Sequence, residues 1–211
     1  MNTRRMTSVV LLPLLSALLL GAAEPWNEKP YTEWSEKEVQ RVFTDSPWAH
    51  SYVDPQAHGA LGPMKADASG TVQWASARTV REAIVRQKQL KGVYKAEEAT
   101  RFLSATPTHH VLLVFGPSAR LFEWATEKEA QEAARLRLKR HKKEIPATSV
   151  RFIHGDAKIA AAEFLFDRET DGQATVAADE EKVSFICSPH NITISVEFDL
   201  RKMVRDGKPD L

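Results

Sequence analysis

The sequence predicts an α+β fold in which helices pack on one face of a largely antiparallel sheet. Helix signals concentrate in the first half of the chain, where the clearest is Ser35 followed by Glu38 ahead of an apolar stripe. Strand signals concentrate in the second half, where apolar and polar residues alternate from Ile192 to Leu200. A helix-rich first half and a strand-rich C-terminal half favour this arrangement over alternating βαβ units.

The first 23 residues carry the features of a secretory signal peptide. Arg4 and Arg5 precede an apolar run over residues 8–20, and small residues lead to a cleavage site after Ala23. An uncleaved membrane anchor is the alternative, but the run is shorter than the roughly 20 apolar residues of a span and contains Pro13. We therefore expect export, periplasmic or secreted, after cleavage near Ala23, with no transmembrane segment in the mature chain.

Composition limits the class of protein. A mature chain that begins at Glu24 keeps 188 of the 211 residues, which is enough for one domain with a substantial core. Without the two arginines of the signal peptide it has 27 basic and 28 acidic residues. A balanced charge gives no reason to expect attraction to nucleic acid. We expect an N-terminal helix (about 35–45) and a long irregular segment within 24–70, followed by a single α+β domain over 71–211.

Cys187 is the only cysteine, so no intrachain disulfide can form and packing must stabilise the fold. It follows Val183 and Phe185 at intervals of two residues, on the same face of a predicted strand. This position favours a buried, inert thiol over a catalytic one.

The predicted N-terminal helix has signals at both of its ends. Ser35 and Glu38 have the spacing of a capping box, and Trp34 and Val39 have the spacing of a hydrophobic staple. Pro47 prevents the helix from continuing. The structural interpretation is that Trp34, and Trp48 beyond the turn, anchor the helix. The functional alternative is that the two tryptophans form an aromatic binding surface for a sugar or a partner.

The remaining elements follow from periodicity and capping signals. The continuous apolar run at 111–115 predicts a central strand covered on both faces. Acidic residues 168–181 predict an exposed loop. The other predicted elements are a strand at 71–75, a helix opened by Thr79 with Glu82 and ended by Gly92, a helix at 95–104, a helix from Thr126 to about Lys143, and strands at 150–152, 164–166, 183–187 and 192–200.

Basic residues crowd the C-terminal half of the helix predicted at 126–143. On a helix, Arg135, Lys139 and Lys142 would share one face, since their spacing is i, i+4, i+7. The structural interpretation is a solvated face whose cations suit a helix C-terminus. The functional alternative is a binding surface for an anionic envelope polymer, a lipid headgroup or an acidic partner.

Histidines are the candidates for chemistry at neutral pH. His154 and Asp156 could place an imidazole and a carboxylate in one loop, and His58 lies in the irregular segment. His109 and His110 are adjacent on a predicted strand, so their side chains point to opposite faces and do not chelate an ion. The sequence contains no metal-ligand spacing, nucleophile motif or phosphate-binding loop, and we predict no metal site and no cofactor.

Several runs resemble, in the same order, a family of secreted proteins of environmental bacteria that has no assigned function. The N-terminal motif is Trp34-Ser-Glu-Lys-Glu-Val-Gln40 with Thr44-Asp-Ser-Pro-Trp-Ala49. The runs 74–83 and 198–204 and the pair Gly207-Lys208 follow it. The resemblance covers nearly all of the mature chain. It implies export and a shared fold, but no activity and no catalytic residue.

Together these features predict an exported, non-catalytic module of the bacterial envelope that binds a protein partner or an anionic envelope component. The alternative is a small periplasmic hydrolase with a His/Asp site, around His154 and Asp156 or in the segment 45–58. Convergence of two or more histidines with a carboxylate in one pocket would favour the enzyme. Scattered imidazoles would favour the binding module.

Overall fold

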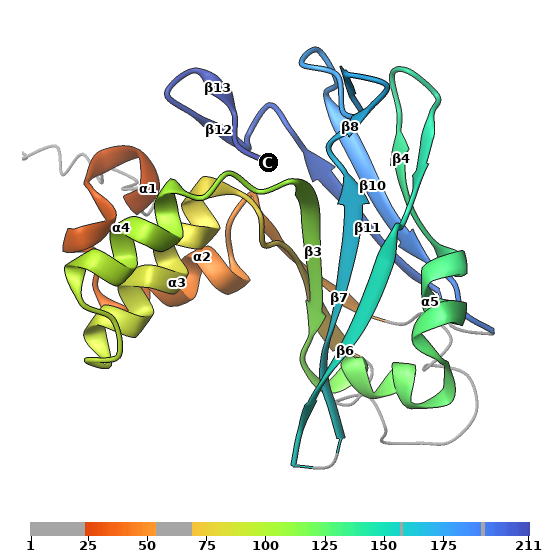
Figure 1. The fold of residues 1–211 in the computed structure, drawn as a ribbon, viewed down its shortest axis with the longest axis horizontal. Helices are drawn as coiled ribbons and strands as arrows, with labels where there is room; N and C mark the ends of the chain where they lie inside the picture. Colours follow the sequence, from red (N-terminus) through yellow and green to blue (C-terminus); the bar gives the residue numbers. More distant parts are fainter. Residues whose placement is uncertain (1–23, 54–68, 157, 191–192) are drawn as a thin grey trace, which may run out of the picture.

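The computed structural model describes residues 24–53, 69–156, 158–190 and 193–211. The predicted signal peptide, His58, most of the predicted irregular segment and Ile192 lie outside them. The α+β class is confirmed, since most helices belong to the first half of the chain and antiparallel strands dominate the second. Figure 1 shows the helices of the first half gathered at one end of the molecule and the sheets occupying the rest.

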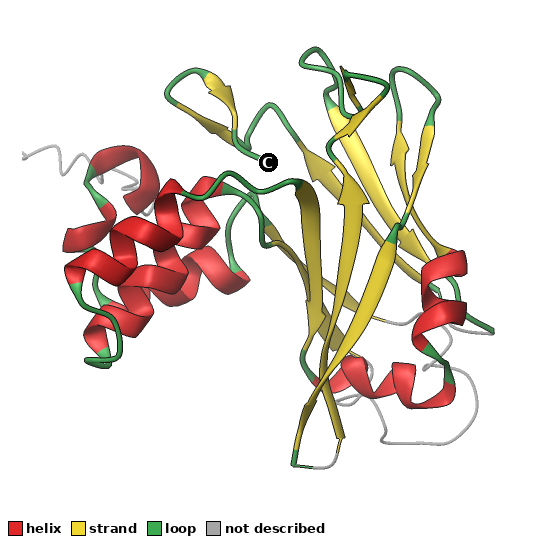
Figure 2. Ribbon diagram, in the orientation of Figure 1, coloured by secondary structure: helices red, strands yellow, loops and turns green. Residues whose placement is uncertain are grey.

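The helical layer contains short N-terminal turns and three longer helices. The elements are α1 (Pro25–Glu28), η1 (Tyr31–Glu33), α2 (Glu36–Thr44), α3 (Arg78–Leu90) and α4 (Ala96–Ser104). The predicted helix end at Gly92 and the predicted helix at 95–104 are confirmed. In Figure 2 this layer stands beside the strands, and α2 and α3 contact each other within it.

The predicted capping box of α2 is confirmed. The Ser35 amide donates to the Glu38 carboxylate at 2.8 Å, and the Glu38 amide donates to the Ser35 hydroxyl oxygen at 3.4 Å. These bonds, and an ion pair with Lys29 at 2.9 Å, lower the pKa of Glu38 to about 2. Local residues therefore satisfy the Ser35 and Glu38 amides at the start of this helix.

We expect Ser35→Ala to lower the free energy of unfolding by about 0.5–2 kcal/mol, because the Glu38 amide loses its acceptor. Urea denaturation of the purified mature protein measures the change. Ser35→Asp is the matched control, because aspartate is also a good N-cap and should retain most of the stability. Equal stability of the alanine variant and the wild type would show that the box contributes nothing.

The strands form two main antiparallel sheets. The first has the order β1-β2-β3-β7-β6, with β1 (Ala49–Val53), β2 (Ser69–Trp74), β3 (His109–Phe115), β7 (Lys158–Asp167) and β6 (Ser149–Gly155). The second has the order β11-β10-β4-β5, with β11 (Ile194–Asp199), β10 (Lys182–Cys187), β4 (Ala134–Leu138) and β5 (Glu144–Pro146).

Smaller elements complete the fold. They are the 3-10 helix η4 (Pro117–Trp124), the helix α5 (Glu127–Ala133), the hairpin of β8 (Glu169–Thr170) and β9 (Gln173–Ala174), and the C-terminal hairpin of β12 (Val204–Arg205) and β13 (Lys208–Pro209). The predicted exposed loop at 168–181 thus includes a hairpin, and Thr175, Val176 and Glu180 within it are buried.

The inner faces of the two sheets share one hydrophobic core. Phe164 of the first sheet lies edge-on to Phe185 of the second, with ring centroids 5.1 Å apart, and Trp74 lies edge-on to Phe198 at 5.3 Å. The same core extends from Trp26 in the helical layer to Met203, so the N-terminal helices are part of it. The sequence predicted strands but not their division between two sheets.

The prediction of a helix from Thr126 to about Lys143 is wrong beyond the first two turns. The capping box of Thr126 and Glu129 is present, but α5 ends at Ala133 and β4 begins at Ala134. The run Ala-Arg-Leu-Arg-Leu alternates with a period of two, which places Leu136 and Leu138 in the core, where they pair in register with Phe185 and Val183. Pairing with β10 therefore prevailed over the helix propensity of these residues.

Two further expectations need correction. The box predicted for Thr79 and Glu82 does not form, because the N-cap of α3 is Ala77, two residues before Thr79, and both predicted capping residues are buried within the helix. Strand β3 is central in its sheet, but only one of its faces is fully covered. His110 and Leu112 on the inner face are buried, whereas Val111 and Leu113 on the outer face are half-buried.

Candidate functional site

The tryptophans do not form an exposed binding surface, which corrects that alternative. Trp34 and Trp48 are both fully buried. The indole N–H of Trp34 donates to the carbonyls of Pro25 and Lys29, each at 3.2 Å, and that of Trp48 donates to the Asp210 carbonyl at 2.8 Å. They anchor the N-terminal segment and the C-terminal segment to the core.

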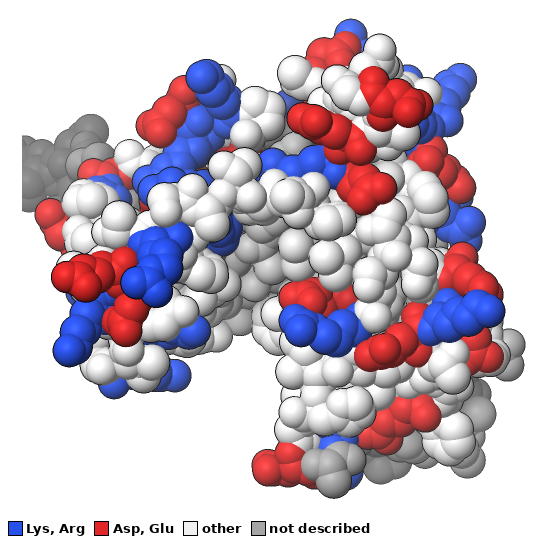
Figure 3. Space-filling view, in the orientation of Figure 1, with Lys and Arg blue, Asp and Glu red and all other residues white. Residues whose placement is uncertain are grey.

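The basic residues do not share a helix face, because Arg135 lies on β4 and Lys139 and Lys142 lie in the turn that follows it. Most of this cluster is paired with carboxylates. Arg135 contacts Glu144 at 3.7 Å, and Lys139 forms an ion pair with Glu197. Lys142 has a positive φ of 52° in the turn. On the face shown in Figure 3, acidic and basic side chains are likewise interspersed.

The structure describes two of the three residues of the His/Asp alternative. His154 and Asp156 are exposed at the end of the β6–β7 hairpin, and His58 lies outside the described residues. Within the described part of the chain, no group of three or more His, Cys, Asp or Glu side chains could hold a metal ion.

The other histidines are distributed over the molecule. His190 contacts Glu129 at 3.6 Å, and His109 contacts Asp167 at 3.3 Å. His50 lines a cavity of about 410 Å³ together with Asp45, and burial lowers its pKa. The structure therefore does not bring two of the described candidate histidines together with a carboxylate.

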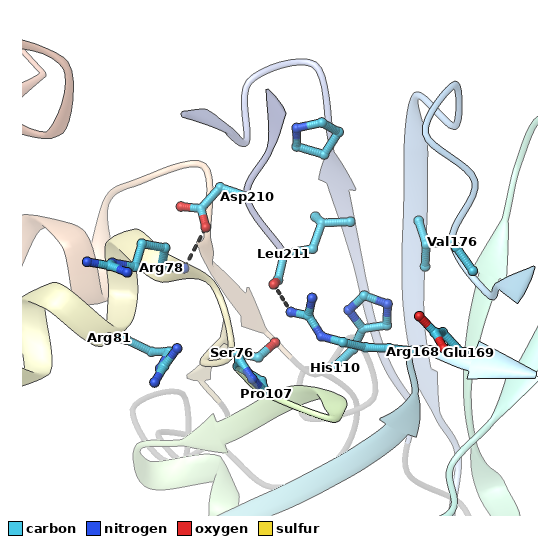
Figure 4. Close-up of a pocket in the computed structure, with 12 residues that line it drawn as sticks. Ser76, Arg78, Arg81, Pro107, His110, Arg168, Glu169, Val176, Asp210 and Leu211 are labelled. Atoms are coloured by element: carbon cyan, nitrogen blue, oxygen red, sulfur yellow. Dashed lines mark hydrogen bonds between the residues drawn. The ribbon is translucent and has the colours of Figure 1, made fainter. Parts of the chain in front are cut away.

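A different cavity gathers charged groups from four distant parts of the sequence. It has a volume of about 390 Å³ and lies where the helical layer, the first sheet and the C-terminal segment meet (Figures 1 and 4). We call it the arginine pocket. Its lining residues are Ser76, Arg78, Arg81, Pro107, His110, Arg168, Glu169, Ala174, Val176, Pro209, Asp210 and Leu211.

Asp210 forms one wall of the arginine pocket and caps α3 from the far end of the chain. Its carboxylate accepts from the amides of Arg78 at 2.5 Å and Thr79 at 3.0 Å, and its own amide donates to the Met203 carbonyl at 2.8 Å. The helix N-terminus is therefore neutralised by a carboxylate that is 6% exposed. This cap fixes both α3 and the C-terminal segment at the edge of the cavity.

Arg81 and Arg168 line the pocket beside Asp210. Arg81 is only 9% exposed; its guanidinium donates to the Phe102 carbonyl and lies 5.1 Å from the centre of the Phe102 ring. Arg168 donates to the His109 carbonyl at 3.2 Å and to an oxygen of Leu211, the last residue of the sequence. Among the described residues, no Asp or Glu side chain forms an ion pair with either guanidinium. Burial lowers the pKa of both, and each is close enough to Asp210 to feel its charge.

Arginine is almost never buried without a partner of opposite charge. Glu82 illustrates the usual arrangement, because its carboxylate is 3% exposed and pairs with Arg78 at 2.9 Å and also with Arg205. Arg81, one residue earlier in the helix, has only neutral carbonyl acceptors. Arg81 is therefore influenced by the charge of Asp210 without forming an ion pair with a carboxylate side chain of the described residues.

Two neutral polar groups complete the pocket. His110 is 4% exposed, and burial together with the charge of Arg168 lowers its pKa to about 3, so the ring is neutral at physiological pH. Its Nδ1 has no hydrogen-bond partner among the described residues. Ser76 accepts from the Val111 amide at 3.1 Å, which leaves its hydroxyl hydrogen free to donate.

The low pKa of His110 predicts a loss of stability in acid. The folded protein disfavours the protonated ring, so this contribution is complete above the unfolded pKa of about 6.5 and declines as the pH falls toward 3. We expect a decline of up to about 1.4 kcal/mol per pH unit between pH 6 and 4. Urea denaturation across this range measures it. His110→Gln, which cannot titrate, should flatten the decline, and an unchanged profile would contradict this assignment.

The sequence pattern did not indicate the arginine pocket. No pair among Arg81, Arg168 and Asp210 has a short spacing, so periodicity and motifs could not connect them. One local signal was available in α3, where the charged residues Arg81 and Glu82 stand between the apolar residues Val80 and Ala83, and all four are buried. Charged residues on a buried stripe indicate paired or functional groups.

The fold and the pocket define this chain as an α+β protein of a helical layer and two antiparallel sheets, with an arginine-lined cavity where the helical layer, the first sheet and the C-terminal segment meet. Comparison with protein-family models, with curated proteins and with solved structures finds no significant match. None of the helices in the described residues is both long and apolar enough to span a membrane.

Proposed function

We propose that this protein is an exported binding module of the bacterial envelope, periplasmic or secreted, that holds an anionic group of an envelope component or of a protein partner in the arginine pocket. Export is supported by the signal-peptide features of residues 1–23 and by the resemblance to secreted bacterial proteins. The observation that carries the binding proposal is Arg81, which lines the pocket, is 9% exposed and forms no ion pair with an Asp or Glu side chain of the described residues. The half-buried Arg168 is close enough to add its charge.

A bound anion would interact favourably with both arginines. Burial lowers the pKa of each guanidinium, and an anion between Arg81 and Arg168 would stabilise the charged form of both because it attracts both cations. The volume of about 390 Å³ is within the usual range of small-ligand sites. The neutral ring of His110 adds a polar group without adding a charge.

Substitution of Arg81 by methionine tests the proposal. Arg81→Met keeps an apolar side chain of about the length of the arginine methylene stem and removes the guanidinium charge. We expect the stability of the free protein to change by less than about 1.5 kcal/mol, because one hydrogen bond is lost while a desolvated charge is removed. We also expect the variant to lose anion binding. The measurement is the melting temperature during titration with acetate, phosphate or sulfate, against chloride at the same ionic strength.

A ligand that binds the folded state stabilises it by about 2.7 kcal/mol at a concentration of 100 Kd, so binding raises the melting temperature in a dose-dependent way. Arg101→Met is the matched control, because Arg101 is an exposed arginine on α4 outside the pocket. Specific stabilisation of the wild type and the Arg101 variant, but not of the Arg81 variant, supports the proposal. Identical responses of all three proteins to every anion would contradict it.

A further inference from the structure

We propose that the connection between α3 and α4 docks this protein on a membrane surface that contains anionic phospholipid, with Leu90 and Val93 entering the headgroup region and the surrounding lysines contacting lipid phosphates. We call residues 88–95, Lys-Gln-Leu-Lys-Gly-Val-Tyr-Lys, the basic tip. It lies at the end of the helical layer away from the sheets (Figure 1) and shares no lining residue with the arginine pocket. The surface is therefore separate from the anion site proposed above.

Two large apolar side chains are exposed at the basic tip. Leu90 is 45% exposed and Val93 is 61% exposed, and only two residues separate them. The other exposed large apolar side chains of the described residues, Trp124 and Ile153, belong to two different elements, η4 and β6. Single exposed apolar residues are ordinary on a protein surface, whereas exposed apolar residues that gather at one place indicate an interaction surface.

The backbone of the basic tip forms a defined turn. Helix α3 ends in a Schellman motif, in which the Gly92 amide donates to the Gln89 carbonyl at 2.9 Å and the Val93 amide donates to the Lys88 carbonyl at 2.8 Å. Gly92 has a φ of 68°, which glycine adopts without strain. The apolar residue after such a glycine usually packs against the last turn of its helix, but Val93 is mostly exposed. The turn therefore presents this side chain with little ordering required on binding.

The charged side chains of the basic tip are all positive. Residues 83–96 include no acidic side chain and four basic ones, which are Arg86, Lys88, Lys91 and Lys95. The Arg86 guanidinium is engaged, because it donates to the Trp34 carbonyl at 2.7 Å. Lys91 and Lys95 are exposed and form no ion pair with a described residue, in contrast to the paired lysines of other elements. Two ammonium groups beside the apolar side chains are thus available for an anionic partner.

The acidic residues on either side of this run form no ion pair with its lysines in the described structure. Glu82 is buried and engaged in the two ion pairs described above. Glu97 and Glu98 lie in the first turn of α4, where the Glu98 carboxylate accepts from the Lys95 amide at 2.5 Å. Carboxylates at this position interact favourably with the helix N-terminus. Figure 3 shows basic side chains beside uncharged ones at the lower end of the helical layer.

The combination of exposed apolar side chains and lysines fits the surface of an anionic membrane. Each lysine near such a surface strengthens binding by about 5-fold, because the ammonium group is attracted to the negative surface potential. Apolar side chains add to binding when they enter the boundary between headgroups and acyl chains. A purely electrostatic partner, such as an acidic polymer, would use the lysines but not Leu90 and Val93.

Co-sedimentation of the mature protein with phospholipid vesicles tests the inference. The vesicles are phosphatidylcholine with and without about one third phosphatidylglycerol, in about 0.1 M salt. We expect partition onto the anionic vesicles to be about 10-fold stronger or more, and we expect Lys91→Gln with Lys95→Gln to remove most of this difference. The matched control is Lys128→Gln with Lys158→Gln, which removes two exposed lysines of α5 and β7 and should bind as the wild type does.

Leu90→Ser with Val93→Ser separates insertion from charge attraction. This variant keeps every lysine and should bind the anionic vesicles about 5-fold more weakly or less tightly still, because the apolar contribution is lost. Melting temperatures should match that of the wild type, since both side chains are exposed. Equal binding by the lysine variant and its control, or unchanged binding by the serine variant, would overturn the inference. Retention of soluble polyglutamate without binding to either vesicle would identify an acidic partner and would overturn it as well.

Discussion

Replacing Phe164 with alanine is expected to lower the free energy of unfolding by about 3–5 kcal/mol, the largest single effect that we predict. The ring is fully buried between the two sheets. Its centroid lies 5.1 Å from that of Phe185 in the other sheet and 5.7 Å from that of Phe122 in η4. Truncation removes apolar burial and leaves a cavity that three separate elements would have to fill.

Urea denaturation of Phe164→Ala measures this effect. Trp124→Ala is the matched control, because Trp124 is a large aromatic residue that is 80% exposed and should change stability by less than about 0.5 kcal/mol. Phe164→Leu should fall between the two, since most of the volume remains. Similar losses for Phe164→Ala and Trp124→Ala would show that Phe164 does not join the two sheets.

Replacing Asp210 with alanine is expected to cost about 2–4 kcal/mol. The change leaves the amides of Arg78 and Thr79 without their acceptor, and Thr79 is fully buried. Loss of an N-cap costs about 0.5–2 kcal/mol, and a buried donor without a partner costs about 1–3 kcal/mol. The cost should exceed that of Ser35→Ala, because Ser35 is exposed and water can replace its hydroxyl.

Asp210→Asn separates the cap from the charge. Asparagine is as good an N-cap as aspartate, so this variant should recover much of the stability that the alanine variant loses. Hydrogen exchange of the α3 amides in each variant locates the effect at the helix N-terminus. Full stability of Asp210→Ala, or loss of protection in α2 rather than α3, would contradict the assigned cap.

The local elements of this protein could be predicted from the sequence because their determinants lie a few residues apart. Ser35 and Glu38 cap α2, and Thr126 and Glu129 cap α5, through bonds that span three residues. Alternation likewise indicated β10 and β11, and Cys187 is buried with its pKa raised to about 12, which leaves the thiol protonated. Each of these features depends on residues that lie only a few positions away in the sequence.

The predictions that proved wrong concern segments whose structure depends on contacts with a distant part of the chain. Thr79 and Glu82 have the spacing of a capping box, but Asp210 caps α3 across 131 residues of chain. Residues 134–138 have composition typical of a helix, but pairing with β10 makes them a strand. In both cases a tertiary contact stabilises the observed structure by more than the local preference does, and that preference is worth about 1 kcal/mol or less.

By itself, the sequence determined the α+β class, the starts of α2 and α5, and the buried state of the single cysteine, because hydrogen bonds and periodicity within a few residues fix these features. The division into two sheets and the arginine pocket were decided by the tertiary structure alone. Arg81 belongs to an α-helix, Arg168 follows the end of a strand, and Asp210 belongs to the C-terminal segment. Only the folding of the chain around the common core brings these three residues together.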